Sequence, residues 1–483
     1  MLERRENWWS RPCGGRELLI LALPLVISTS FTSVMHFTDR LFLTWYSMDA
    51  MAASMQAGIV QWTLICFAFG VASYVNTFVA QYHGAGHDER VGLAVWQGIW
   101  FGILLTPLFL LSIPLAPWIF DLAGHEENIR REEITYFQIL AWGSGATVIQ
   151  TAMSAFYTGR GQTWVTMAVS FVACAVNVVL DYLFIFDYVP LGIPGIAGAA
   201  WATVIAQWSA VVAYGIWMYS SPAVVKKYGL LTGWRLNGEL MRRLVYFGGS
   251  SGAQMVIEAS GFTLLVTIVG RLGAVESAAT TLAFNSNIVA FIPMVGLGIA
   301  VSTLVGQQLG NNRPDNAARA TWNGLALALG YASVFATLYL IVPQIFFAAH
   351  SAGAHGEDFV QSRAMAEILL RFVALYFLFD AAQIIFVCAL KGAGDTWYVL
   401  LVAGTVSILS VTIGQLGTPT FAPLVGGGIY WWWYVITGWI FTLAVLYLAR
   451  FLQGGWRTKR VIEEEFTLPA GVSLPNDLSS DAV

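Results

Sequence analysis

The sequence predicts an all-α membrane protein of about twelve transmembrane helices, and three observations point to this class. Charged residues make up only 11% of the 483 residues and hydrophobic residues 57%, whereas soluble proteins carry about 25% charged residues. Apolar runs near the roughly 20 residues that cross a bilayer recur along the chain. Basic residues gather on one set of the loops between these runs. The composition excludes soluble, disordered and disulfide-rich classes, and the net charge of −4 argues against a nucleic-acid partner.

Hydrophobicity places the spans in order along the chain. The polar stretch 1–15 is expected to be a cytoplasmic segment without a cleavable signal peptide. The acidic stretch 454–483 is expected to be a cytoplasmic disordered tail. The twelve expected spans are 16–44, 52–81, 92–120, 132–157, 164–187, 195–219, 241–270, 277–309, 317–348, 364–390, 397–417 and 426–452.

The distribution of basic residues predicts the orientation of these spans. If the spans alternate in direction, 18 of the 24 Lys and Arg residues fall on the side that holds both termini. Basic residues favour the cytoplasmic side, so we expect cytoplasmic termini and a multi-pass protein of the plasma (inner) membrane. Tryptophan clusters at Trp8–Trp9 and at 431–433 are expected to form interfacial belts.

An internal repeat divides the chain into two similar halves. Residues 70–98 match residues 296–324 at nine positions, including Gln81 with Gln307 and Gly84 with Gly310. The turn at 159–164 likewise resembles the one at 392–397. Each half holds six spans, so both halves face the same way, related by a pseudo-two-fold axis along the membrane normal. This predicts an N-lobe at 16–220, a cytoplasmic linker at 221–240 and a C-lobe at 241–453, with a binding site between them.

Asp39 is the first of a few acidic residues inside the spans. Ser28, Thr32 and His36 precede it at steps of four, four and three residues, so all four share one helical face. Pro24 lies upstream and is expected to kink this helix. The alternative is that Asp39 pairs with its neighbour Arg40 or caps a helix end near the interface.

Three further spans carry acidic residues at depth. Asn177 and Asp181 are four residues apart in the fifth span, as are Gln254 and Glu258 in the seventh. In the tenth span, Tyr376 and Gln383 share a face with Asp380. Structural roles remain open for all of them, including an ion pair of Asp380 with Arg371.

Ionisable residues inside a membrane are costly, which makes these acids candidates for function. Burial disfavours the charged form of a carboxyl group, so such a group can bind a proton or exchange it for a cation. Two acidic clusters that face one cavity would also attract a cationic substrate. We find no clustered nucleophile and base and expect no enzyme. Gly248–Gly252 fits G-x-S-x-G but lies at the start of a span, and His125 is expected to be solvated.

Several segments, in order and spacing, resemble the multidrug and toxic compound extrusion (MATE) family. The resemblance covers roughly residues 16–453 in both halves. The segments that carry it are Met35–Asp39, Val79–Gln81 with Gly84, Asn177–Asp181, Gly195–Thr203, Glu258, Val305–Gly310 and Asp380–Gln383 leading to Leu390–Asp395.

The resemblance implies two six-helix lobes around a central cleft and export of organic cations in exchange for protons or sodium ions. In one branch the matching residues are Asp39, Asn177 and Asp181, with Thr203 nearby. In another branch they are Glu258 and Asp380. Either set would hold the sodium ion, the only metal expected, and no cofactor is expected. Arg40 departs from the family pattern beside Asp39.

We therefore expect a secondary active antiporter that exports organic cations or drugs and works as a monomer in the lipid bilayer. One alternative is a flippase for lipid-linked sugars or other amphiphiles, which would line its cleft with Arg and Lys for phosphates. Here only Arg40 and Arg371 are basic at depth. A passive channel is the other alternative, although a channel needs no two-lobed repeat.

Overall fold

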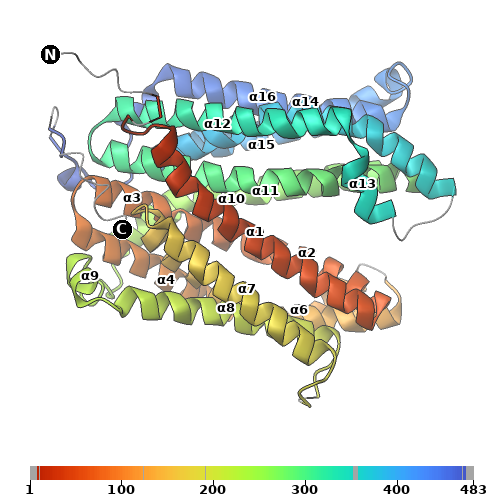
Figure 1. Cartoon of the computed structure of the whole chain (residues 1–483), viewed down its shortest axis with the longest axis horizontal. Coiled ribbons are helices and arrows are strands. Elements are labelled where there is room, and N and C mark those ends of the chain that lie inside the picture. The colour runs from red at the N-terminus through yellow and green to blue at the C-terminus, as the bar shows by residue number, and fades with distance from the viewer. Residues whose placement is uncertain are drawn as a thin grey trace. The chain divides into compact units, whose positions relative to one another are not determined.

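The computed structural model describes residues 8–9, 11–122, 125–190, 192–351, 357–469 and 472–474. Helices joined by turns make up this part of the chain, and no strand occurs in it (Figure 1). Each of the twelve expected spans corresponds to one long helix or to a helix with a short continuation. Eleven of these are apolar enough to cross a membrane. The predicted all-α membrane fold is confirmed.

The twelfth long helix, α6 (Glu127–Thr158), is less apolar because it lies inside a bundle. It packs against α2, α4 and α8. Small residues let neighbouring side chains approach closely: a Cβ at Gly143 would overlap Gln207, and one at Gly145 would overlap Thr106. The charged residues at its start and the small and polar residues at these contacts give α6 its lower hydropathy.

The chain divides into two compact units. The N-unit comprises Ile27–Ala253, Gly306–Arg313 and Arg460–Val483. Its helices are most of α1 (Gly15–Tyr46), then α2 (Met48–Ser73), α3 (Val75–Gly84), α4 (Asp88–Leu110), η1 (Ile113–Leu115), α5 (Ala116–Asp121), α6, α7 (Thr163–Ile185), α8 (Ile196–Tyr219), α9 (Pro222–Lys227), the first half of α10 (Gly238–Gly270), the end of α11 and the 3-10 turn η3 (Glu464–Phe466).

The C-unit comprises Met1–Val26, Gln254–Val305 and Pro314–Lys459. In it α14 packs against α12 and α16, and α15 packs against α16 (Figure 1). Its helices are the second half of α10, most of α11 (Ala274–Gly310), α12 (Pro314–Ile341), α13 (Gln344–Ser351), α14 (Glu357–Ala393), α15 (Thr396–Phe421), α16 (Gly428–Gln453) and η2 (Gly455–Thr458).

Two predicted spans are interrupted by proline-containing breaks. The span expected at 92–120 consists of α4, the 3-10 turn η1 and the short helix α5, with Pro114 and Pro117 near the starts of the last two. The span expected at 317–348 ends at Ile341, and α13 begins after Pro343. Proline lacks the backbone donor of a helix interior and fits the first helical turn instead, so each proline begins a new helix.

The repeated glycine turns adopt matching conformations. Gly161 has φ of 84° and Gly394 has φ of 100°. Only glycine adopts this left-handed region without steric cost, so each turn is able to reverse the chain between two helices. The tight turns predicted from the repeat are confirmed at both positions.

The other repeated motif, Gln-x-x-Gly, makes a reciprocal contact within the N-unit. A Cβ at Gly84 would overlap the backbone carbonyl oxygen of Gln307, and a Cβ at Gly310 would overlap that of Gln81. The Gln307 Nε2 atom also donates to the carbonyl oxygen of Gly159 at 2.8 Å. The ends of α3 and α11 therefore pack backbone to backbone, which requires glycine at both positions.

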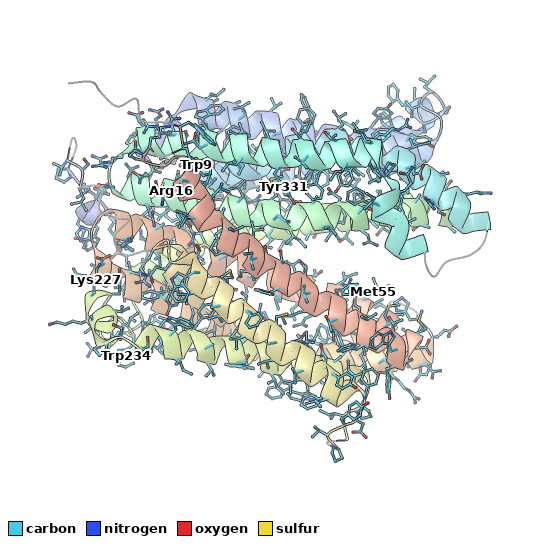
Figure 2. All side chains as sticks on the ribbon, in the orientation of Figure 1. Trp9, Arg16, Met55, Lys227, Trp234 and Tyr331 are labelled. Carbon is cyan, nitrogen blue, oxygen red and sulfur yellow. The ribbon has the colours of Figure 1, made fainter. Side chains whose placement is uncertain are left out.

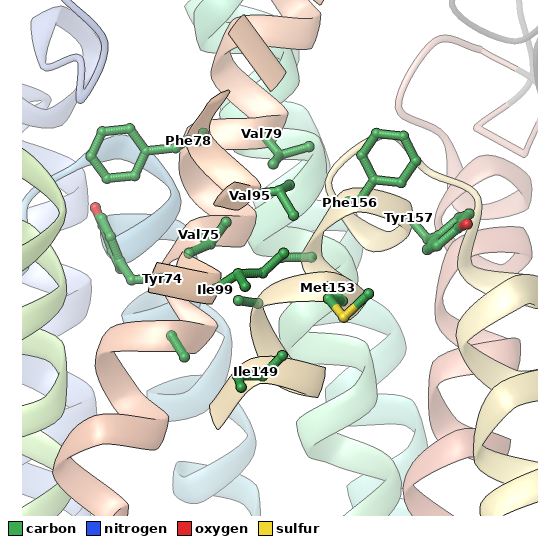
Figure 3. Close-up of a cluster of buried hydrophobic side chains, with 14 of the residues drawn as sticks. Tyr74, Val75, Phe78, Val79, Val95, Ile99, Ile149, Met153, Phe156 and Tyr157 are labelled. Atoms are coloured by element: carbon green, nitrogen blue, oxygen red, sulfur yellow. The ribbon is translucent and has the colours of Figure 1, made fainter. Parts of the chain in front are cut away.

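A hydrophobic cluster fills the N-unit between α3, α4 and α6 (Figure 3). Aromatic and branched side chains meet there, and Val75, Val79 and Val95 are fully buried. Phe156 stacks edge-to-face on Tyr157, with ring centroids 5.0 Å apart. Burial of apolar side chains in this cluster holds α3 against α6, and α6 also carries Tyr136 of the candidate site described below.

The tryptophan clusters do not all lie at the surface. Trp8 and Trp9 are partly exposed, as are Trp234 and Lys227 at one end of the N-unit (Figure 2). Trp432 and Trp433 are instead buried in the C-unit, and Trp433 Nε1 donates to Thr280 Oγ1 at 3.3 Å. The belt expected at 431–433 is therefore wrong for these two residues, because their rings pack against neighbouring helices.

The described part of the expected disordered tail is packed. Val461 and Ile462 are buried, and the Val461 amide donates to Gln81 Oε1 at 2.8 Å. Arg243 of α10 donates to the carbonyl oxygens of both tail residues. We call residues 460–469 and 472–474 the strap. The hydrogen bonds that hold the strap involve its backbone groups, which the amino-acid composition does not reveal. A disordered tail was therefore expected from the sequence. The rest of the tail lies outside the described residues.

Replacing Arg243 with alanine is expected to loosen the strap. The Arg243 guanidinium makes three hydrogen bonds to the strap, at 2.8 to 3.0 Å. Hydrogen bonds to charged groups contribute about 1.5–3 kcal/mol each after exchange with water. Loss of the equivalent of one such bond should make trypsin cleave at Arg460 at least about tenfold faster in the variant. The neighbouring exposed Arg242, replaced with alanine, is the control, and equal cleavage of the two variants would contradict the role of Arg243.

Candidate functional site

Asp39 lies in the C-terminal half of α1, within the N-unit. Only 6% of it is exposed. The hydroxyl of Tyr136 on α6 donates to its Oδ2 atom at 3.1 Å, whereas Oδ1 has no hydrogen-bond partner in the described structure. Arg40 is exposed and makes no ion pair with Asp39 among the described residues; it acts on the carboxylate only electrostatically. In the described structure Asp39 is therefore hydrogen-bonded to Tyr136 and does not form the alternative ion pair with Arg40.

Asn177 and Asp181 lie one turn apart on α7. Both are buried, with 1% and none of their surface exposed. The amide of Asn177 donates to Thr203 Oγ1 on α8 at 3.4 Å. Neither carboxylate oxygen of Asp181 has a hydrogen-bond partner in the described structure. The four-residue spacing predicted from the sequence therefore places an amide and an unpaired carboxyl group on the same buried face of α7.

These residues form one group in the N-unit. Asp39 and Asp181 are close enough to interact electrostatically, and Tyr136 interacts with both. Four helices, α1, α6, α7 and α8, contribute the group. Two neighbouring buried carboxyl groups without a cation between them disfavour double ionisation, so a proton or a bound cation would stabilise the pair. We call Asp39, Tyr136, Asn177, Asp181 and Thr203 the N-unit acidic site.

The C-unit carries a second acidic group. Gln254 Nε2 donates to Glu258 Oε1 on α10 at 2.7 Å. Glu258 interacts electrostatically with Asp380 of α14, which is 8% exposed. Asp380 interacts in the same way with Tyr376, one turn earlier on α14. The structure therefore brings together four of the residues predicted from the seventh and tenth spans.

Lys391 is a neighbour of this group that the sequence did not reveal. Helix α14 continues to Ala393, so Lys391 lies in its last turn rather than in a loop. There it interacts electrostatically with Glu258. We call Gln254, Glu258, Tyr376, Asp380 and Lys391 the C-unit acidic site. Like Arg40 beside Asp39, Lys391 places a cation within electrostatic reach of a buried carboxyl group.

Two further residues predicted from the sequence, Gln383 and Pro24, lie on helices that carry these sites. Gln383 is half-buried on α14, three residues after Asp380. Pro24 lies inside α1, which remains helical through it, and the boundary between the two units follows between Val26 and Ile27. Proline leaves the carbonyl oxygen four residues earlier without its helical donor. A kink at this position stays a prediction.

No group of three or more His, Cys, Asp or Glu side chains that could hold a metal ion occurs in the part of the chain that is described.

A groove of about 810 Å³ runs along the N-unit surface. Trp142, Trp201 and Trp208 line it together with aliphatic side chains of α4 and α8. None of the residues of the N-unit acidic site lies in this lining.

A family model described as MatE matches two segments of the chain, residues 24–183 and 251–416. The chain belongs to the MATE family. Both acidic sites fall within the matched segments, except for Thr203. As a MATE protein it is a multi-pass membrane transporter rather than an enzyme, which confirms two predictions from the sequence.

Relatives of this MATE protein carry names that refer to drug resistance. It is 26% identical over 383 residues to the probable multidrug resistance protein NorM of Xanthomonas campestris, which covers 78% of this chain and 81% of the relative. It is 27% identical over 386 residues to the multidrug resistance protein PmpM of Pseudomonas aeruginosa, which covers 79% of both chains.

Solved MATE structures share its fold. The crystal structure of the eukaryotic MATE transporter AtDTX14 superposes with a TM-score of 0.81 at 18% identity, covering 92% of this chain and 96% of the other. The outward-facing structure of a multidrug resistance MATE family transporter superposes with a TM-score of 0.81 at 17% identity, covering 92% of this chain and 97% of the other. At these identities the likeness supports the fold of the MATE protein and carries no residue roles.

Proposed function

We propose that this MATE protein is a secondary active antiporter that exports organic cations or drugs in exchange for protons or sodium ions. The carrying observation is the pair Asp39 and Asp181, two buried carboxyl groups with three oxygens that lack hydrogen-bond partners in the described structure. A buried, unpaired carboxylate is unfavourable by several kcal/mol. Binding of a proton, a sodium ion or a cationic substrate removes this penalty, so these ligands compete for the same charge.

Competition for one charge supplies the coupling. A ligand that binds one conformation better shifts the protein towards it by its difference in affinity. If the coupling ion favours one facing of the substrate site and the substrate the other, an inward ion gradient drives substrate outwards. The multidrug resistance names of the NorM and PmpM relatives support organic cations as the substrate class. We place both termini in the cytoplasm on the basis of the basic loops, and expect a monomer in the plasma membrane.

Asp39→Asn, Glu258→Gln and Asp380→Asn test this function. Each change removes the charge of the side chain at nearly constant shape. In the variants of at least one acidic site, the rate of ethidium or norfloxacin efflux should fall by about tenfold or more, equivalent to about 1.4 kcal/mol. Efflux from cells and uptake into vesicles, driven separately by a pH gradient and by a sodium gradient, measure the effect and identify the ion.

The matched control is Asp315→Asn, because the Asp315 side chain is 83% exposed on α12. It should transport as the wild type does. Unchanged efflux in all three acidic-site variants would contradict carboxylate coupling. Downhill flux without accumulation against a gradient would favour a passive channel, and transport of a lipid-linked sugar would favour a flippase.

A further inference from the structure

Glu133 is a buried carboxyl group of α6 that neither acidic site includes. None of its surface is exposed. Its Oε1 atom lies 2.8 Å from Nδ1 of His125, and its Oε2 atom has no hydrogen-bond partner in the described structure. A buried carboxyl group of this kind needs a proton or a cation nearby. Only one of its two oxygens has such a neighbour.

His125 connects Glu133 to the surface. Its side chain is 35% exposed and it precedes the first turn of α6. The other end of α6 is followed by Gly159, whose carbonyl oxygen accepts from Gln307 beside the strap. His125 therefore lies at the end of the N-unit bundle opposite the strap. Its imidazole ring carries a nitrogen atom on each side, so His125 can contact both water and Glu133.

The other charged groups at this end of α6 face neighbours other than Glu133. Arg130 pairs with Asp121 of α5 and with Glu127, and Arg131 pairs with Glu127. Glu132 is repelled by another acid, Asp49 of α2, and Arg40 of α1 acts on Tyr136 and Asp39. Among the described residues, His125 is thus the one side chain able to carry a positive charge that lies within ion-pair distance of Glu133.

The buried face of α6 leads from Glu133 to the N-unit acidic site. Glu133, Tyr136, Phe137 and Leu140 are all buried and follow the spacing of one helical face. Glu133 and Tyr136 differ by about 4.5 Å of helix rise. Tyr136 lies one turn after Glu133 on this face, without a direct hydrogen bond between their side chains in the described structure. The hydroxyl of Tyr136 then reaches Asp39.

We propose that His125 and Glu133 form the entrance of a proton relay that ends at Asp39 and Asp181. Neutral His125, with its proton on Nδ1, passes that proton to Glu133 while water supplies one to Nε2, and a flip of the ring then restores the starting tautomer. Protonated Glu133 passes its proton through one water to the Tyr136 hydroxyl oxygen, while Tyr136 passes its own proton to Asp39 Oδ2. The net change is one proton moved from the surface to Asp39, without oxidation or a new covalent bond. The relay rests on the proposed antiport.

Glu133→Gln tests the relay, because glutamine keeps the shape and cannot carry the proton. The purified full-length protein is reconstituted in liposomes that contain a pH-sensitive dye, and an ethidium gradient drives counter-flow of protons. We expect proton flux to fall by about a hundredfold, as on loss of a proton-transfer group, with the KM for ethidium unchanged. Glu133→Asp, which keeps a carboxyl group, should restore part of the flux. His125→Gln should give a smaller loss and a changed dependence on external pH.

Glu132→Gln is the matched control, because it makes the same change one residue earlier and outside the buried face. It should behave as the wild type, and thermal unfolding in detergent should show that every variant folds. If Asp39→Asn stops proton flux and Glu133→Gln does not, the relay is wrong and the antiport stands. If wild-type exchange moves sodium ions but no protons, the relay is likewise overturned. A wild type without exchange of either ion contradicts the proposed function itself.

Discussion

Alanine at Gly84 or at Gly310 is expected to prevent stable folding. At either position a Cβ would overlap a backbone carbonyl oxygen, that of Gln307 or that of Gln81. A backbone group cannot rotate away as a flexible side chain does, so the ends of α3 and α11 would have to separate. Overpacking in tightly packed regions typically costs about 1–3 kcal/mol and at times more. A backbone overlap that cannot relax costs more than this range and can exceed the roughly 5 kcal/mol that keeps a marginally stable protein folded.

Fluorescence-detected size-exclusion chromatography and thermal unfolding in detergent measure this effect. Gly249→Ala is the control, because a Cβ there meets nothing within 4 Å and the residue lies inside α10. Alanine favours a helix over glycine by about 0.5–1 kcal/mol, so this variant should be at least as stable as the wild type. Wild-type unfolding temperatures for both Gly84→Ala and Gly310→Ala would show that the backbone contact is not essential.

Asparagine at Asp181 is expected to abolish transport while leaving the fold intact. Asp181 is fully buried with two oxygens that lack partners in the described structure. The amide carries no charge, so its burial costs less than that of the carboxylate. The unfolding temperature should therefore stay the same or rise. Transport in liposomes should fall by about a hundredfold, because the site can no longer exchange a proton.

Asp187→Asn is the matched control for this change. Asp187 is exposed, follows α7 and has φ of 56°, a conformation that asparagine tolerates well. It should transport normally. Wild-type transport by Asp181→Asn would remove Asp181 from the coupling mechanism, and a marked fall in unfolding temperature would indicate a structural role instead.

Much of the fold could be predicted from the sequence because membrane spans follow from hydrophobicity alone. The seventh span, expected at 241–270, is α10 at Gly238–Gly270. The predictions were wrong where proline breaks or backbone hydrogen bonds, rather than hydrophobicity, determine the structure. Pro114 and Pro343 end or begin helices inside runs that remain apolar. The strap is held by Arg243 and Gln81 through backbone groups, which no pattern of side chains predicts.

The candidate site was predicted where one helix carries two polar groups. Asn177 with Asp181 and Gln254 with Glu258 could be found from their spacing of four residues. Tyr136, Glu133 and Lys391 were missed because their importance depends on which helices are neighbours. A signal was present for Glu133: it occupies the same helical face as Tyr136, Phe137 and Leu140 and is the acidic member of an otherwise uncharged stripe.

The reciprocal contact of the two Gln-x-x-Gly motifs has a consequence for how the chain arose. Gly84 meets Gln307 as Gly310 meets Gln81, so each copy of the motif recognises the other copy of itself. That is the pattern of an isologous interface, in which identical surfaces meet across a two-fold axis. A half-length ancestor with one motif would close the same contact with a second, identical chain. Gene duplication and fusion would then have turned a homodimer interface into an internal one.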